Sequence, residues 1–263
     1  MNQNIISMRA SDGSVVKLEC HDSLVSTVNL TRAYAKMGYP DKYVVMTEKR
    51  ARLDSDAKVK GYDKGIFMSC LLRPSIFPSQ ATLIAPLSAV AFTLGLESHT
   101  HFKLGIGWVG KIYCEGEAIG EVAIEGKLDD FTSYEYMIVT FSCILPEDKF
   151  PLMISNLIKK VFAEEETTIP VIMAKDILNR FFPLYQNLKT TSKFMDAYKQ
   201  KFILRGEKVI YNDGGKRRKY KVMGIDPSNC ALLLEGRDKK VFPVFNPTSV
   251  SAPRKIRKSK KEE

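Results

Sequence analysis

Trp108-Val109-Gly110-Lys111, followed by Glu117-Ala118-Ile119-Gly120, is the most informative pair of runs in this chain. The two runs lie at the end of one predicted strand, 102–108, and at the start of the next, 118–124. Gly105, Gly107 and Gly120 leave backbone exposed where a flat apolar ligand could lie, with Trp108 as one wall. The alternative is that Trp108 is a core residue and that the glycines mark bulges. The sequence leaves both interpretations open.

The chain has the length and composition of a folded globular protein. Its 263 residues are enough for one substantial core and a small second domain, and 44% of them are apolar. No run of about 18 apolar residues occurs, so no membrane span is expected, and the first residues lack the pattern of a secretory signal. Five widely spaced cysteines, with no Cys-x-x-Cys pair, are typical of reduced thiols. We therefore expect a cytoplasmic protein.

Histidines and charged residues indicate little specific chemistry. His99 and His101 could reach one metal ion together, but no third ligand is near in the sequence, so we expect two solvent-facing loop histidines and no metal site. The net charge is +10, and residues 254–263 alone contribute six basic and two acidic side chains. Because this segment has no apolar periodicity, we expect a basic disordered tail over 253–263.

Hydrophobic periodicity and turn signals predict both helices and strands. A helix is expected from Asp22 or Ser23 to about Met37, and the polar stretch 48–64 predicts a long surface loop. The helix predicted over 79–94 is apolar nearly all round, which indicates a central buried helix. The remaining predicted elements are a hairpin over 5–9 and 15–19, strands over 43–46, 66–72 and 137–144, and helices over 147–162 and 172–184.

A domain boundary is predicted near 201–206, because short strands and turn signals alternate beyond it. Strands over 208–211 and 219–222 flank Asn212-Asp213-Gly214-Gly215, and strands over 231–235 and 241–244 follow. Four or five short strands in about 45 residues predict a small β-barrel. The predicted division is therefore a first domain over 1–203, a barrel over 204–252 and the tail.

Motifs along almost the whole chain occur in one recognisable order. Ser26-Thr27-Val28-Asn29 opens a helix, a strand ends in Leu72-Arg73-Pro74, and Val222-Met223-Gly224-Ile225-Asp226 precedes Ala231-Leu232-Leu233-Leu234-Glu235. In this order the chain resembles biotin–protein ligases, whose pattern around the tryptophan is Lys-Trp-Pro-Asn-Asp followed by Lys-x-x-Gly. The resemblance implies an α+β fold with a mixed central sheet and packed helices, as in biotin/lipoate ligases, followed by a small C-terminal β-barrel. It also implies ATP-dependent, AMP-forming activation of biotin and its transfer to a carrier-protein lysine.

The resemblance further implies roles for single residues. Ser26 and Thr27 would hydrogen-bond the ureido group of biotin, and Trp108 with the three glycines named above would surround the ligand. Arg50 could reach the ligand from the stretch 48–64. Lys111 is the nearest cation to the place where an ATP-derived phosphate would lie, which makes it the one catalytic candidate. Biotin, together with ATP and Mg²⁺ if the protein is active, is the implied ligand set.

The sequence departs from the family at the positions that carry its chemistry. The family's glycine- and arginine-rich phosphate loop is replaced by Leu53-Asp54-Ser55-Asp56-Ala57-Lys58, whose carboxylates would repel an adenylate. Gly107 and Glu117 stand in place of the family's two lysines, and Gly110-Lys111 replaces the Asn-Asp that would favour Mg²⁺. The alternative to an active ligase is therefore a catalytically inactive relative with a degenerate site, acting as a ligand-binding, partner-binding or regulatory module.

Several partners are compatible with these hypotheses. A biotin carrier domain is expected for an active ligase, pairing of two chains through the sheet edge is a further option, and lipoate or octanoate is a lesser alternative to biotin. A third hypothesis is nucleic-acid binding by the small barrel, with Lys216-Arg217-Arg218-Lys219 and the basic tail contacting the backbone and Tyr211, Tyr220 and Phe242 interleaved with this charge. It ranks lowest because exposed basic hairpins are common, so the expected partners include neither nucleic acid nor membranes.

Overall fold

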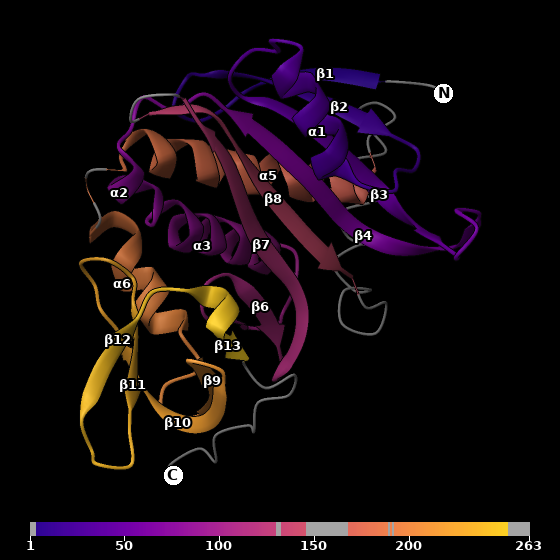
Figure 1. Cartoon of the computed structure of the whole chain (residues 1–263). Coiled ribbons are helices and arrows are strands. Elements are labelled where there is room, and N and C mark those ends of the chain that lie inside the picture. Colours follow the sequence, from indigo (N-terminus) through magenta and orange to yellow (C-terminus); the bar gives the residue numbers. More distant parts are fainter. Residues whose placement is uncertain (1–3, 130–132, 146–167, 189, 191, 252–263) are drawn as a thin grey trace.

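The computed structural model describes residues 4–129, 133–145, 168–188, 190 and 192–251. The helix predicted over 147–162 and the tail predicted over 253–263 lie outside the described residues. Two sheets organise the described part of the chain, a larger one in the first two thirds and a smaller one near the C-terminus (Figure 1).

The large sheet is mixed, as the resemblance implies. Its eight strands follow the order β1-β2-β3-β4-β8-β7-β6-β5, and they pair antiparallel except for β2 and β3, which are parallel. Helix α1 makes the crossover between these two parallel strands, as parallel pairing requires. The strands are β1 (Asn4–Arg9), β2 (Val15–His21), β3 (Tyr43–Leu53), β4 (Val59–Leu72), β5 (Leu104–Ile106), β6 (Lys111–Cys114), β7 (Glu117–Leu128) and β8 (Tyr134–Ile144).

Helices cover both faces of the large sheet. Helix α1 (Thr27–Lys36) packs on one face, and α3 (Ile84–Glu97) and α5 (Ile169–Gln186) pack on the other (Figure 1). Eleven residues of α3 are buried, which confirms the predicted central helix. The shorter helices are α2 (Pro78–Ala81) and α6 (Ser192–Lys201).

The prediction of a surface loop over 48–64 is wrong, since this stretch forms a β-hairpin. Strand β3 continues to Leu53 and β4 starts at Val59, with ladder pairs from Lys49 and Lys64 out to the turn. Beyond Ala51 the side chains of the hairpin are exposed along β3. Because solvent covers both faces there, the strands need no apolar alternation, and the sequence lacks that signal.

The start of α1 also differs from the prediction. The helix begins at Thr27, and Ser26 rather than Asp22 or Ser23 is its N-cap, with the Ser26 Oγ accepting a hydrogen bond from the Asn29 N–H at 3.2 Å. The residues before it are held by β3, because the backbone of Leu24 bonds to Lys49 and Ala51. Strand β6 and helix α6 have no counterpart among the predicted elements.

The C-terminal sheet is open rather than a closed barrel. Its order is β12-β11-β10-β9-β13, and its two outer strands do not pair with each other within the described residues. One outer strand has only two residues, and the other contains Pro243, which has no N–H to donate and therefore favours an edge position. The strands are β9 (Lys208–Asp213), β10 (Lys216–Ile225), β11 (Leu232–Glu235), β12 (Val241–Val244) and β13 (Val250–Ser251), with a 3-10 turn (η1, Pro247–Ser249) before the last.

The two sheets share one core. The indole Nε1 of Trp108 donates a hydrogen bond to the carbonyl of Cys230 at 2.8 Å, from a side chain that is buried. Ile106 forms a parallel bridge with Phe202, where the chain leaves α6 for the small sheet. A single apolar cluster runs from the large sheet to Val222 and Leu232 in the small one.

Two other predictions concern side chains. His99 is buried, and its Nε2 lies 2.6 Å from Asp176 Oδ2, because the turn after α3 packs on α5. The prediction of a solvent-facing histidine is therefore wrong for His99. His101 is exposed, as expected.

All five cysteines are thiols, and burial raises the pKa of Cys20 to about 11.

Among the helices of residues 4–251 that are described, none combines the length and apolar character needed to cross a bilayer.

Candidate ligand-binding site on the large sheet

A strip of polar side chains crosses the face of the large sheet that carries α1. Register places Lys111 opposite Glu121, Glu121 opposite Ser142, and Ser142 opposite Phe67. Directly paired residues of antiparallel strands project to the same face. These four side chains therefore form one row across β6, β7, β8 and β4, and we call this row and its polar neighbours the polar strip. The neighbours, described below, are Thr27, Arg32, Arg50, Ser69, Glu125 and Thr140.

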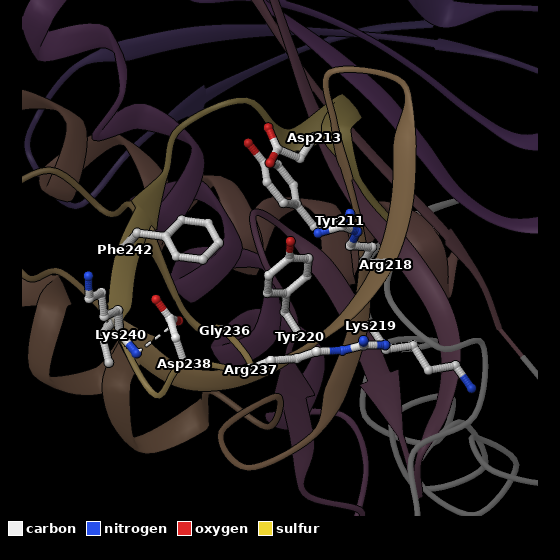
Figure 2. Close-up of a pocket in the computed structure, with 11 residues that line it drawn as sticks. Tyr211, Asp213, Arg218, Lys219, Tyr220, Gly236, Arg237, Asp238, Lys240 and Phe242 are labelled. Carbon is white, nitrogen blue, oxygen red and sulfur yellow. Dashed lines mark hydrogen bonds between the residues drawn. The ribbon is translucent and has the colours of Figure 1, made fainter.

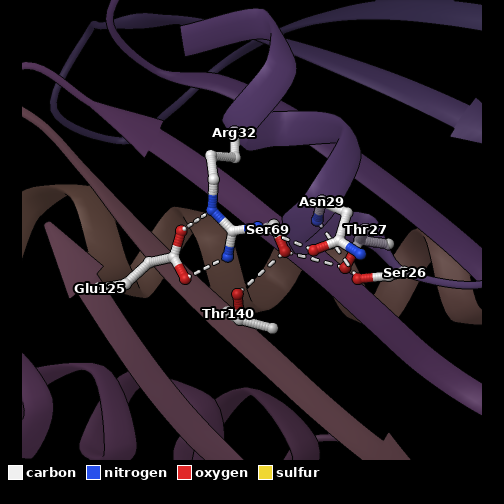
Figure 3. A network of polar contacts seen from close by, with 7 residues as sticks. All are labelled: Ser26, Thr27, Asn29, Arg32, Ser69, Glu125 and Thr140. Atoms are coloured by element: carbon white, nitrogen blue, oxygen red, sulfur yellow. Dashed lines mark hydrogen bonds and ion pairs between the residues drawn. The ribbon is translucent and has the colours of Figure 1, made fainter. Parts of the chain in front are cut away.

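A chain of three hydroxyl groups lies at the start of α1. Thr27 Oγ1 is 2.8 Å from Ser69 Oγ, which is 3.0 Å from Thr140 Oγ1 (Figure 3). Ser69 is fully buried and Thr27 nearly so, whereas Thr140 is half-buried. Because each hydroxyl rotates, the chain is able to present either a donor or an acceptor to a neighbouring polar group.

Arg32 ties α1 to the opposite side of the strip. Its Nε and Nη2 donate to the two carboxylate oxygens of Glu125 at 2.7 and 2.6 Å, and its Nη1 donates to Asn29 Oδ1 at 2.9 Å (Figure 3). The Glu125 hydrogen bond raises the pKa of the Arg32 guanidinium, because it favours the charged form of that group. This fork-to-fork contact satisfies the guanidinium and positions the helix over the strip.

Arg50 reaches the strip from the hairpin. Its Nη2 donates to Asp63 Oδ2 at 3.0 Å, its Nη1 lies 3.5 Å from Ser142 Oγ, and its guanidinium lies 4.6 Å from the centre of the Phe67 ring. The same carboxylate also receives Arg52, whose Nε is 3.3 Å from Asp63 Oδ1. One aspartate therefore contacts both arginines of the hairpin, and the three side chains together keep a net charge of +1.

Lys111 is exposed on β6, with the carboxylate of Glu121 as its cross-strand neighbour. The structure thus brings four of the predicted site residues to one face, namely Ser26 and Thr27 at the start of α1, Arg50 on β3 and Lys111 on β6. The charge on this face is nearly balanced, because Glu121, Glu125 and Asp63 lie among its cations.

The other predicted residues adjoin protein atoms. Trp108 contacts the C-terminal sheet, as described above, and a Cβ added to Gly105 would lie 2.4 Å from Ile203 Cγ2. A Cβ on Gly107 would lie 2.8 Å from Tyr113 Cε2, and one on Gly120 would lie 2.5 Å from the Ser142 carbonyl oxygen. Close packing therefore accounts for glycine at each position, and Gly105 and Trp108 lie at the junction of the two sheets.

Several polar-strip residues were not singled out from the sequence. Ser69 interrupts the apolar run 66–72, and Thr140 and Ser142 alternate with apolar residues along 137–144. Polar residues at a spacing of two in an otherwise apolar strand are a usable signal, since such residues share one face. Asp63 and Glu125 carry no comparable signal, because their partners are set by strand register.

No model of a protein family matches the sequence, and a search of curated proteins gives no match. Solved structures do match. A biotin protein ligase-like protein of unknown function from a Silicibacter species is 14% identical, with a TM-score of 0.63 over 87% of this chain and 94% of that one. Biotin protein ligase from Aquifex aeolicus is 15% identical, with a TM-score of 0.63 over 89% and 96% of the two chains.

The same Aquifex aeolicus enzyme in complex with biotin and ATP gives a TM-score of 0.60 at 15% identity, over 89% of this chain and 97% of that one. The chain therefore has a biotin protein ligase-like fold, which confirms the fold that the resemblance implies, except that the C-terminal sheet is open and not a closed barrel. At these identities the match establishes the fold and leaves the activity to be argued from the side chains.

Proposed function

We propose that this protein binds biotin or a related acyl ligand on the polar strip and does not activate it with ATP. The observation that carries this proposal is the buried hydroxyl chain of Thr27, Ser69 and Thr140, placed beside arginines that carboxylates already hold. The ureido group of biotin is neutral and offers both a carbonyl acceptor and N–H donors. A chain of rotatable hydroxyls suits such a group.

The residues of the polar strip fit an acyl ligand better than they fit a nucleotide. Activation by ATP needs cations beside the phosphates as charge develops there. Arg50 and Arg52 share Asp63, and Lys111 has Glu121 across the strand. We therefore favour a catalytically inactive relative that acts as a ligand-binding or regulatory module.

In this proposal Ser26, Thr27 and Arg50 face the ligand directly. Gly105, Gly107, Gly120 and Trp108 act through packing, because protein atoms adjoin each of them. Five thiols without a disulfide suit a reducing compartment such as the cytoplasm.

An active biotin–protein ligase is the second candidate, and the place of Lys111 favours it. This exposed side chain lies in the same cross-strand row as Ser142, with Glu121 between them, on the face proposed to hold the acyl ligand. In an active enzyme Lys111 would stabilise the charge of the phosphates, and ATP with Mg²⁺ would be required. A biotin carrier domain would receive the acyl group. The enzyme would act on it as a monomer or as a homodimer.

Calorimetric titration with biotin, lipoate and ATP tests the binding proposal. We expect biotin or lipoate to bind in the absence of ATP, and Thr27→Val to weaken that binding about ten-fold by removing one hydroxyl at constant volume. Thr31→Val is the matched control, because Thr31 is buried one turn further along α1 and its hydroxyl finds no partner within the described residues. Absence of binding by both acyl ligands contradicts the proposal.

Labelling of a carrier domain with biotin and ATP separates the two candidates. The inactive relative gives no label, whereas an active ligase labels the domain and loses that activity in Lys111→Ala. Labelling that survives in Lys111→Ala removes Lys111 from the chemistry but still excludes the inactive relative.

A further inference from the structure

The C-terminal sheet has an open groove of its own, about 630 Å³ in volume, between the β9–β10 hairpin and the β11–β12 hairpin (Figure 2). Three rings form its floor: Tyr211 on β9, Tyr220 on β10 and Phe242 on β12. Their centres lie 5.6, 5.9 and 5.4 Å apart, and all three side chains are half-buried. We call this feature the aromatic groove.

Strand register explains why the rings converge. Tyr211 pairs with Arg218 across β9 and β10, and Tyr220 follows two residues later on the same face. Phe242 pairs with Leu234, and Leu234 pairs with the buried Val222, which follows Tyr220 two residues later on the same face. The rings therefore lie between the apolar core of the small sheet and the solvent. Each is held edge-on or tilted by the other two, and each keeps part of its surface exposed.

The rim of the aromatic groove is basic. Arg218, Lys219, Arg237 and Lys240 line it and are exposed, against two acidic residues, Asp213 and Asp238. Lys219 alternates with Arg218 and Tyr220 along β10, so its side chain extends away from the three rings (Figure 2). The Asp238 carboxylate accepts a hydrogen bond from the backbone N–H of Lys240. In the part of the chain that the structure describes, none of the four basic side chains forms an ion pair. Their charge is therefore available to an anionic ligand.

We propose that the aromatic groove binds single-stranded nucleic acid, with bases stacked on its three rings and phosphates held by Arg218, Arg237 and Lys240. Aromatic platforms beside cations are the combination that single strands need, because their bases are unstacked and their backbone is charged. A duplex keeps its bases stacked and offers no ring surface to the floor. A proline-rich peptide uses aromatic floors but has no need of three cations.

Fluorescence anisotropy of a labelled oligothymidylate of about 12 nucleotides, titrated with the full chain, tests the floor. Phe242→Leu keeps apolar volume and removes a stacking surface, so we expect about a ten-fold loss of affinity, while Phe242→Tyr stays near the parent. Phe245→Leu is the matched control, because Phe245 is 63% exposed, close in sequence, and outside the groove. Equal losses in Phe242→Leu and Phe245→Leu overturn the proposal.

The rim is tested at exposed positions where a substitution does not threaten folding. Arg218→Gln combined with Arg237→Gln should reduce the slope of log affinity against log salt by about 1.4, since each lost phosphate contact removes about 0.7 on a single strand. Glutamine at Arg254, Lys255, Arg257 and Lys258 controls for basic charge elsewhere in the sequence. An unchanged slope in the rim variant, equal affinity for duplex, or binding of a proline-rich peptide in place of the oligonucleotide each overturns the proposal.

Discussion

The polar strip of the large sheet and the aromatic groove of the small sheet both present arginines, but they use them in opposite ways. In the strip, Glu125 holds Arg32, and Asp63 holds both Arg50 and Arg52. In the groove, Arg218 and Arg237 are exposed beside half-buried rings. A net charge of +10 therefore says little about where an anion binds. Local pairing decides it, because a carboxylate at hydrogen-bond distance cancels most of the field of its partner.

The first prediction concerns rigidity and has the largest expected effect. Gly65→Ala in the large sheet would place a Cβ 2.0 Å from the Cys143 carbonyl oxygen, so the backbones of β4 and β8 must separate. We expect a loss of about 3 kcal/mol of unfolding free energy, measured by urea denaturation.

The matched variant in the small sheet is Gly236→Ala. Its Cβ would approach the Asp238 Oδ1 at 2.8 Å, the far end of a flexible side chain that is able to rotate away. We expect a cost below about 1 kcal/mol. Similar losses for both variants would contradict the contrast between a rigid large sheet and an adaptable small one.

The second prediction uses salt. Three basic side chains at the groove, Arg218, Arg237 and Lys240, correspond to a slope of about −2.1, so affinity for a single-stranded oligonucleotide should fall about 20-fold between 50 and 200 mM salt. Biotin binding to the strip should change by less than about two-fold, because the proposed hydrogen bonds join neutral groups. Parallel titrations at both salt concentrations check this. A steep salt dependence of biotin binding would mean that the strip relies on its cations after all.

The third prediction reverses the pairing in the strip. Asp63→Asn releases Arg50 and Arg52, so we expect affinity for inorganic pyrophosphate to rise roughly five-fold, the worth of about one partly exposed ionic contact. Asp56→Asn, at the exposed turn of the same hairpin, changes the net charge equally without touching either arginine. Calorimetric titration measures the affinity of both variants for pyrophosphate. If that affinity rises equally in both, the net charge of the protein, and not the local pairing of the arginines, controls anion binding to the strip.

The fourth prediction concerns alkaline pH and has the smallest expected effect. Burial, followed by the nearby Glu48, raises the pKa of Cys20 from 9.0 to about 11. The folded state therefore keeps this proton more tightly than the unfolded state does. The stabilisation is fully present below about pH 9 and is lost as the pH rises through about 11.

Cys20→Ala should flatten that loss, so the lead in melting temperature of the parent over the variant should be smaller at pH 10.5 than at pH 7, by at most about 2 °C. Melts at pH 7 and pH 10.5 provide the check. A lead of the parent that grows toward alkaline pH has the wrong sign for a buried thiol.

Most of the fold could be predicted from the sequence where one face of an element meets the core. The first hairpin, α3 and the strands of the small sheet carry clear periodicity or turn signals, and Gly13 adopts the positive φ of +82° that its turn requires. The hairpin over 48–64 could not be predicted, because solvent lies on both of its sides. Strand β6 and helix α6 are short, and the open edge of the small sheet depends on which outer strands find partners.

In the candidate site, too, some residues could be predicted from the sequence and others could not. Ser26, Thr27, Arg50 and Lys111 were predicted from motifs, and the structure brings them to one face. The partners of the arginines could not be predicted, since Arg32 and Glu125 are 93 residues apart and meet only through sheet register. The aromatic groove has the same origin: Tyr211, Tyr220 and Phe242 were noted as interleaved with charge, but their convergence depends on three strand pairings.

The Trp108–Cys230 hydrogen bond and the core around it have a consequence for heat denaturation. Apolar side chains continue without interruption from Ile106 through α6 to Val222, so neither sheet has a separate interior to keep when the other melts. We expect a calorimetric scan of the intact chain to give one endotherm, with equal van't Hoff and calorimetric enthalpies. A chain cut at residue 203 would present Ile106 and Trp108 to water, and we expect it to aggregate rather than to persist as an independent unit.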